Sequence, residues 1–303
     1  MGILARVTRG CDRQSQGALD LVRLTALMNL TRGSPEIRVG LIDGPVARDH
    51  ADLAESPIQE VPIKEGASCQ NPNSSACLHG TFVAGILSAR RGSDAPAICP
   101  GCTLLVRPIF SEGGSRGKYE PSTNPDELAA AVLDCISAGA RIINLSLALV
   151  RPSTRTDRAL KSALEHAMLR SIIIVAAAGN QKIVGSTVIT RHPWVIPTAA
   201  CNLEGLPSAY SNVGFSIGTR GLRAPGDGVV SSGADGQSFP SSGTSVAAPF
   251  VTGTIALLWS IFPSATAQEV KLAVTQAPLR RISVVPPLLD AWRAYQTLAL
   301  RHR

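Results

Sequence analysis

The stretch Ser241-Ser-Gly-Thr-Ser-Val-Ala-Ala-Pro249 is the most informative in the chain. Small residues surround Ser245, so the backbone can turn sharply there and another molecule can approach closely. The apolar, uncharged run that follows, up to Trp259, predicts a buried helix that begins near Ser245. A serine at such a helix start is commonly a cap. It can also be a nucleophile, because free N–H groups and the positive end of the helix dipole lie beside it.

Two further motifs place chemically useful side chains beside apolar elements. In His79-Gly-Thr-Phe-Val-Ala-Gly-Ile-Leu87 a histidine opens a second apolar helical run. It is either a surface or capping histidine, or one that is held in a single tautomer and faces a cleft. In Leu41-Ile-Asp-Gly-Pro45 an aspartate follows a short β-branched strand. It is either a turn former or a functional carboxylate.

The order of the elements predicts an α/β fold. Helices are expected between strands, and continuously apolar strands are typical of a mostly parallel sheet covered by helices on both faces. Sites in such sheets lie at the carboxyl ends of strands, which is where Asp43 and Asn180 are expected. The predicted strands are 37–43, 103–110, 141–150, 171–178 and 194–200, and the predicted helices between them are 125–138 and 157–169.

The motifs around Asp43, His79, Asn180 and Ser245 resemble those of the subtilase family of serine peptidases, in that family's chain order. The resemblance runs from about residue 31 to residue 263. It implies a three-layer subtilisin-like fold and an endopeptidase whose catalytic triad is Asp43, His79 and Ser245. It also implies that Asn180, in Ala177-Ala-Gly-Asn180, donates to the oxyanion.

The same resemblance implies two contact surfaces for an extended peptide substrate. One is an edge that pairs with the substrate backbone, and the other is a wall of the specificity pocket. The edge is formed by Asn144, Leu145, Ser146 and Leu147, and the wall by residues 176–179, with Ala177, Ala178 and Gly179 as contacts.

The chain departs from the family pattern without losing any of these catalytic groups. Gly44-Pro45 stands where Ser or Thr and then Gly are usual, and Phe82 where a second histidine is common. Ala148 and Leu149 replace two glycines of the substrate edge. These departures leave open a catalytically silent scaffold that only binds peptides.

A narrower resemblance concerns the segment after Asp43. Asp43-Gly-Pro-Val46 with Asp49, His50 and Leu53 is similar to the maturation proteases of cyanobactins and related ribosomal peptides. Residues 30–39 and 106–110 resemble the same branch. The resemblance implies cleavage of a precursor peptide, with a general degradative protease as the alternative.

Charge and hydropathy indicate which partners and which cellular location to expect. The 303 residues carry a formal net charge of +7, with a pI of about 9.3, but the arginines are dispersed, so we expect no nucleic-acid partner. We find no run of about 18 apolar residues and expect no membrane span. Residues 1–20 lack an apolar core typical of a signal peptide, which favours a cytoplasmic protein. The oligomeric state stays open. We expect a lead-in segment over residues 1–30 and one peptidase domain over residues 31–303.

Seven cysteines leave the thiol chemistry open. The pairs Cys69 and Cys77, and Cys99 and Cys102, are consistent with plain thiols, with loop disulfides or with a metal site. Calcium stays unassigned, because the loop 111–123 offers only two glutamates for a cation that prefers six or more oxygens. No cofactor is therefore predicted. The stretch 288–303 predicts an amphipathic helix that packs on the domain or contacts a partner.

Overall fold

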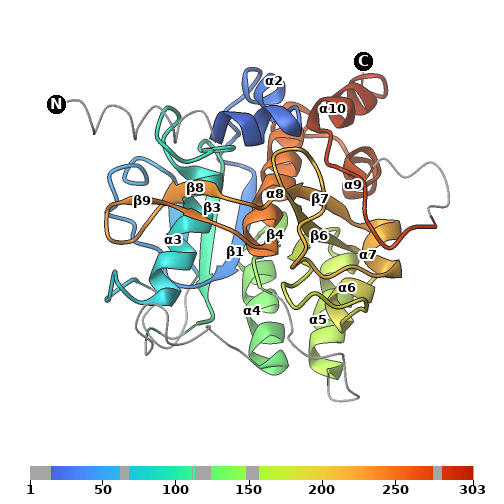
Figure 1. The fold of residues 1–303 in the computed structure, drawn as a ribbon, viewed down its shortest axis with the longest axis horizontal. Helices are drawn as coiled ribbons and strands as arrows, with labels where there is room; N and C mark the ends of the chain where they lie inside the picture. Colours follow the sequence, from blue (N-terminus) through green and yellow to red (C-terminus); the bar gives the residue numbers. More distant parts are fainter. Residues whose placement is uncertain are drawn as a thin grey trace.

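The computed structural model describes residues 15–61, 68–110, 112, 124–147, 157–275 and 282–302. Seven strands form one sheet in the order β2-β3-β1-β4-β5-β6-β7, and every neighbouring pair is parallel (Figure 1). The predicted parallel sheet is thereby confirmed. The strands are β1 (Arg38–Asp43), β2 (Ile58–Glu60), β3 (Thr103–Pro108), β4 (Ile142–Leu145), β5 (Ile173–Ala177), β6 (Val195–Cys201) and β7 (Leu222–Pro225).

Helices cover both faces of this sheet. Alternate residues of β1 show the division: Leu41 packs into the core shared with α3 (Ser75–Ser88) and α8 (Thr244–Ile261). Its neighbour Ile42 packs into the core shared with α4 (Pro125–Ser137) and α5 (Arg158–Leu169). The strands are buried on both sides because each face meets apolar helices, and this explains their uninterrupted apolar sequences.

The strand order places a switch point at β1. From β1 the chain builds outward to β3 and β2 on one side, and to β4 through β7 on the other. Crevices at the carboxyl ends of strands beside such a point are the usual ligand sites of α/β sheets. The carboxyl end of β1 is Asp43.

The predicted elements agree in type with the observed ones and differ in their ends. Strand β4 stops at Leu145, earlier than the predicted run, whose residues 148–150 lie outside the described residues. Helix α3 begins at Ser75, four residues before His79, because Ser74 caps it by accepting a hydrogen bond from Cys77 N. The prediction that His79 opens its helix was therefore wrong. Ser245 does lie in the first turn of α8.

Several elements were not predicted from the sequence. They are the sheet strands β2 and β7, the antiparallel hairpin of β8 (Val229–Ser232) and β9 (Ser238–Ser241), and the helices α2 (Leu24–Met28), α6 (Val188–Arg191), α7 (Phe215–Arg220) and α9 (Ala267–Thr275). The predicted C-terminal helix is observed as α10 (Ala291–Ala299), capped by Asp290 and packed on the core through Leu298.

The described part of the lead-in segment packs onto the same body as the rest. Val22 and Leu27 are fully buried in the core that contains α3 and α8. Helix α2 lies against α10 at the top of Figure 1, and Arg23 pairs with Asp290 there at 3.1 Å. The boundary at residue 30 stays a prediction, and the packing joins both sides of it.

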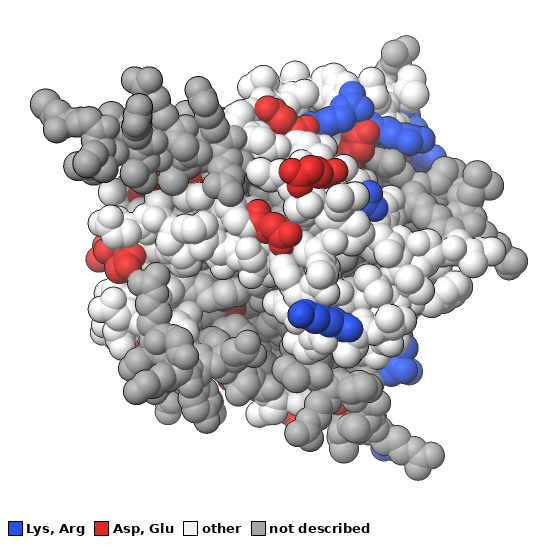
Figure 2. Space-filling model, in the orientation of Figure 1, with Lys and Arg blue, Asp and Glu red and all other residues white. Residues whose placement is uncertain are grey.

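Two expectations from composition can be compared with the structure: the lack of a long apolar run and the dispersed charge. With 18 residues and a mean hydropathy of 1.5, α8 does have the length and composition of a membrane span, contrary to the prediction. Of its residues, 83% are buried against other described elements, as in the core helices of globular proteins. On the face in Figure 2, basic and acidic side chains are dispersed, and they lie side by side near the top of the view.

Candidate active site

Asp43 ends β1 as a fully buried carboxylate. Its Oδ1 accepts hydrogen bonds from Gly44 N and from His79 Nδ1, each at 2.6 Å. Its Oδ2 has no partner among the described residues, and the next residue but one, Pro45, has no N–H to donate. Because an ionised carboxylate only accepts, His79 Nδ1 is the donor and Nε2 is left able to accept a proton.

His79 is held against the end of β1 by two glycines. A Cβ on Gly80 would lie 2.3 Å from Gly44 O, and a Cβ on Gly44 would lie 1.9 Å from Ala76 O. Only residues without side chains allow helix α3 and the segment after Asp43 to approach so closely. The Asp43–His79 contact therefore depends on both glycines.

The pKa of His79 is shifted by burial and by the Asp43 carboxylate. Burial by itself lowers the pKa of His79, since it disfavours the charged ring. The charge of Asp43 and the hydrogen bond to it outweigh burial, so the pKa is raised above the ordinary 6.5. The His79 side chain remains 31% exposed while that of Asp43 is inaccessible. A proton acceptor thus faces solvent with a buried anion behind it.

Ser245 and Asn180 meet around Gly243. A Cβ on Gly243 would lie 3.1 Å from Ser245 Oγ and 3.3 Å from Asn180 Nδ2. The hydroxyl and the amide donor therefore border the same small space. Helix α8, which carries Ser245, packs against α3, which carries His79. The four residues predicted to act together come from the ends of β1 and β5 and from these two helices.

Thr244 fixes the amide of Asn180. Its backbone N–H and its hydroxyl both donate to Asn180 Oδ1, each at 2.9 Å, and its hydroxyl accepts from Gly179 N at 3.0 Å. With Oδ1 bound on the side of α8, the Nδ2 donor points toward the space beside Ser245 Oγ. The sequence did not indicate this role for Thr244, although Thr244 directly precedes Ser245 in the same motif.

The predicted substrate edge divides into two parts. Asn144 and Leu145 are fully buried, and each pairs with both neighbouring strands, β1 and β5. Their backbone thus lies inside the sheet between two strands, and the substrate contacts assigned to them stay predictions. Ser146 and Leu147 follow the last paired residue, so their backbone is not paired with a neighbouring strand of the sheet.

A chain of hydrogen bonds links this edge to Ser245. Thr252 Oγ1 donates to Asn144 Oδ1 at 2.8 Å, and Asn144 Nδ2 donates to Ser146 Oγ at 2.7 Å. Ser146 Oγ in turn donates to Ser245 O at 2.8 Å. Asn144 therefore holds the end of β4 against the start of α8 and does not face a cleft.

The predicted pocket wall lies at the end of β5, where Ala177 and Ala178 are each 2% exposed. Ala178 N donates to Thr198 O on β6, and Gly179 adopts a positive φ of 104°. Gly179 turns the chain toward Asn180. The substrate contacts assigned to Ala177, Ala178 and Gly179 stay predictions.

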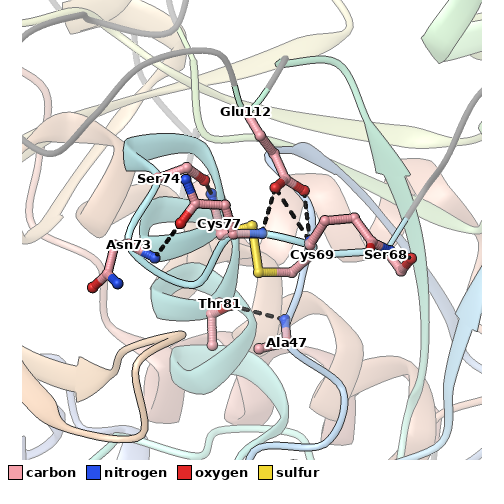
Figure 3. Close-up of a disulfide and its surroundings, with 10 residues drawn as sticks. Ala47, Ser68, Cys69, Asn73, Ser74, Cys77, Thr81 and Glu112 are labelled. Carbon is pink, nitrogen blue, oxygen red and sulfur yellow. Dashed lines mark hydrogen bonds between the residues drawn. A yellow bond between two sulfur atoms is a disulfide. The ribbon is translucent and has the colours of Figure 1, made fainter.

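A disulfide joins Cys69 to Cys77 in the first turn of α3, with the Cα atoms 5.5 Å apart (Figure 3). Glu112 lies beside it and accepts from Gln70 N and Asn71 N, the latter at 2.6 Å. Among the residues the structure describes, Cys69, Cys77 and Glu112 are the one group that could hold a metal, and both sulfurs are bonded to each other. Cys99 and Cys102 are free, buried thiols.

Comparison with known proteins places the whole fold in one family. The sequence model of the subtilase family matches residues 34–284. Mycosin-4 of Mycobacterium tuberculosis (strain ATCC 25618 / H37Rv) is 31% identical over 310 residues, covering 88% of this chain and 65% of mycosin-4. Subtilisin E of Bacillus subtilis (strain 168) is 29% identical over 259 residues, covering 82% and 62%. The chain thus spans slightly less than two thirds of the length of these relatives.

Solved structures give the same result. The prenylagaramide maturation protease PagA is 26% identical with a TM-score of 0.78, over 91% of this chain and 98% of PagA. The self-cleaved protease domain of PatA is 30% identical with a TM-score of 0.75, over 89% and 98%. A lanthipeptide protease, 20% identical with a TM-score of 0.75 over 94% and 93%, shares the fold.

Proposed function

The chain belongs to the subtilase family of serine peptidases, and we propose that it is an endopeptidase that uses Asp43, His79 and Ser245 as its catalytic triad. The observation that carries the proposal is the 2.6 Å hydrogen bond from His79 to buried Asp43. It is made from a helix that packs against α8, where the Ser245 hydroxyl and the Asn180 amide border one space. An oriented imidazole, a hydroxyl at a helix start and an amide donor are the groups that acyl transfer requires.

In this proposal Ser245 Oγ attacks the scissile carbonyl while His79 Nε2 takes its proton. His79 then passes the proton to the leaving amine, and water releases the acyl group from Ser245 by the same steps in reverse roles. Asp43 keeps the imidazole in the tautomer that has Nε2 free, and its charge stabilises the imidazolium that forms. The same interaction raises the pKa of His79, because Asp43 favours the protonated ring.

Asn180 Nδ2 and the backbone N–H of Ser245 would hold the oxyanion. The first N–H groups of a helix have no acceptor within it, and Ser245 lies in the first turn of α8. In a subtilisin, removal of the corresponding asparagine donor costs about 10²–10³ in kcat, and the magnitude expected here is taken from that example.

We further propose that the substrate is a precursor peptide. The support is the similarity over most of the chain to the prenylagaramide maturation protease PagA and the patellamide maturation protease PatA. The segment after Asp43 also resembles that branch in sequence. A degradative role is the second candidate, favoured by the 29% identity to subtilisins.

The test is digestion of a diverse peptide library by the purified protein, read by mass spectrometry, with Ser245→Ala as the control. Cleavage confined to a narrow motif, and absent from the variant, supports precursor processing. Broad cleavage of unrelated unfolded protein supports degradation. Failure of Ser245 to react with a fluorophosphonate, together with no cleavage, would leave the peptide-binding scaffold.

The location of the reaction is a separate proposal. Cytoplasmic processing was our expectation from the N-terminal sequence. The Cys69–Cys77 disulfide weighs against it, because disulfides persist mainly in oxidising compartments. Fractionation of cells with thiol trapping decides the point: alkylatable Cys69 and Cys77 in a cytoplasmic fraction would support the expectation.

A further inference from the structure

We infer that Asn212 is a positioning residue for the oxyanion donor Asn180, which it holds by fixing the backbone on both sides of it. The inference rests on the proposed function, since it assigns Asn212 a part in the same reaction. Asn212 lies 31 residues beyond Gln181 in the chain and is 4% exposed. Its side chain bonds to Ala178, Gln181 and Ile183, on both sides of Asn180, so it acts through Asn180.

The side chain of Asn212 makes four hydrogen bonds, and all of them are to the turn formed by residues 178–183. Its Nδ2 donates to Ala178 O at 3.1 Å and to Gln181 Oε1 at 2.8 Å. Its Oδ1 accepts from Gln181 N at 2.9 Å and from Ile183 N at 3.2 Å. An amide offers two donor hydrogens and two acceptor sites, and all four are directed at residues 178–183.

These bonds hold both peptide planes next to Asn180. The plane before Asn180 carries Gly179 O, which accepts from Asn212 N at 2.8 Å. The plane after it carries Gln181 N, which donates to Asn212 Oδ1. The φ and ψ of Asn180 are the rotations between these two planes, so one residue restrains both.

The turn needs such a restraint because its backbone is strained. Gly179 has φ of 104°, and Lys182, which has a side chain, has φ of 58°. A left-handed conformation at a residue other than glycine costs about 1–2 kcal/mol. The backbone N–H groups of Lys182 and Ile183 are both bound by the segment that carries Asn212. Lys182 N donates to Tyr210 O, and Ile183 N donates to Asn212 Oδ1.

Asn180 itself is exposed, so packing does not hold it. Thr244 anchors only the Oδ1 end of its side chain to α8. Without a fixed backbone, Nδ2 could rotate about that anchor and leave the space beside Ser245 Oγ. Asn212 restrains the backbone of Asn180, and Thr244 restrains its side chain. The Nδ2 donor is directed at the space beside Ser245 Oγ only when both restraints are present.

The consequence is kinetic. A donor that meets charge developing in the transition state affects kcat more than KM. We therefore expect Asn212→Ala to lower kcat by roughly 10-fold or more, with the 10²–10³-fold loss expected of Asn180→Ala as its ceiling, while KM changes little. Loss of fold alone would instead lower the fraction of active enzyme.

The experiment is a double-mutant cycle on cleavage of a library-derived peptide and on the rate of fluorophosphonate labelling. Asn212→Ala should slow both reactions in the wild-type background and have no further effect in the Asn180→Ala background, since the donor it positions is already gone. Gln181→Ala, which removes one acceptor of Asn212, is the milder variant in case Asn212→Ala does not fold. It should lower kcat by roughly 2- to 10-fold, again only when Asn180 is present.

The control is Thr103→Val, which removes a partly buried 2.7 Å hydrogen bond to Pro35 O at the opposite, amino-terminal edge of the sheet. It should lower the melting temperature and leave kcat unchanged. An unchanged kcat in Asn212→Ala and Gln181→Ala, or an equal loss in both backgrounds, overturns the inference alone. A wild-type protein that neither cleaves peptide nor labels overturns the proposed function and the inference with it.

Discussion

The substitution Gly80→Ala tests whether the close contact between helix α3 and the end of β1 sets the chemistry of His79. The added methyl group would lie 2.3 Å from Gly44 O and 2.6 Å from Pro45 O. Both atoms belong to the backbone and cannot rotate away. Helix α3 must therefore move relative to the segment that follows Asp43.

The size of the movement follows from the contact distances. A carbon rarely approaches an oxygen closer than 3.0 Å, so the 2.3 Å contact has to lengthen by roughly 0.7 Å or more. The hydrogen bond between His79 Nδ1 and Asp43 Oδ1, now 2.6 Å, would then reach or pass the upper end of the normal range, about 3.2 Å. Overpacking of this kind costs about 1–3 kcal/mol of stability, which a folded domain survives.

The expected result is a loss of activity together with a shift of its pH dependence. The kcat/KM should fall at least 10-fold, with about 10⁴-fold, the cost of losing the aspartate in a serine-protease triad, as the ceiling. In the wild type, activity requires neutral His79 and so rises with pH through a pKa above 6.5. With Asp43 farther away, burial of His79 gains weight, so this acid limb should move to lower pH.

The assay is kcat/KM for a cleaved peptide between pH 5 and pH 9, with circular dichroism to confirm folding. Gly17→Ala is the matched control, since a Cβ there meets nothing within 4 Å and should change neither the rate nor the acid limb. If Gly80→Ala keeps the wild-type rate and an unshifted acid limb, the reasoning about this contact is refuted.

Three further predictions concern the parts around the site. Thr244→Val removes the hydroxyl bonded to Asn180 Oδ1 and should lower kcat by roughly 2- to 10-fold with KM little changed; steady-state kinetics measure this, and an unchanged kcat contradicts it. Replacing Cys69 and Cys77 together by serine opens a short loop and should cost about 2.5 kcal/mol, seen as a melting temperature several degrees lower; equal melting temperatures would show that the disulfide adds no stability. Phe82→Ala empties a fully buried site in α3 and should cost about 3–5 kcal/mol in urea unfolding, so a loss below 1 kcal/mol would mean that the core refills the cavity.

The sequence predicted most strands of the sheet because apolar runs and the turn residues beside them can be recognised within a few consecutive residues. Strands β1, β3, β5 and β6 are short apolar runs between turn residues, and burial on both faces leaves no room for polar side chains in them. The hairpin β8–β9 was missed because its serines give no such signal. Ser231 and Ser232 are fully buried, and Ser231 Oγ donates to Phe82 O on α3, a contact that the sequence does not indicate.

The sequence by itself determined which chemical groups the proposed site contains. Asp43, His79 and Ser245 could be proposed from the sequence because each lies in a short continuous motif, and because the proposed reaction requires those types of side chain. The sequence also predicted which strand or helix carries each group. It did not reveal where β4 ends, because a continuous apolar run does not show where pairing with the neighbouring strands stops.

Only the tertiary structure decided how these groups are held. The approach of Asn180 to Ser245 at Gly243, the pairing of Cys69 with Cys77 and the hold of Asn212 on the turn 178–183 all join residues from different elements. The physical reason is that hydrophobic periodicity and capping act over a few residues. Contacts between elements depend on strand order and on how closely helices can approach the sheet, which are properties of the packed chain as a whole.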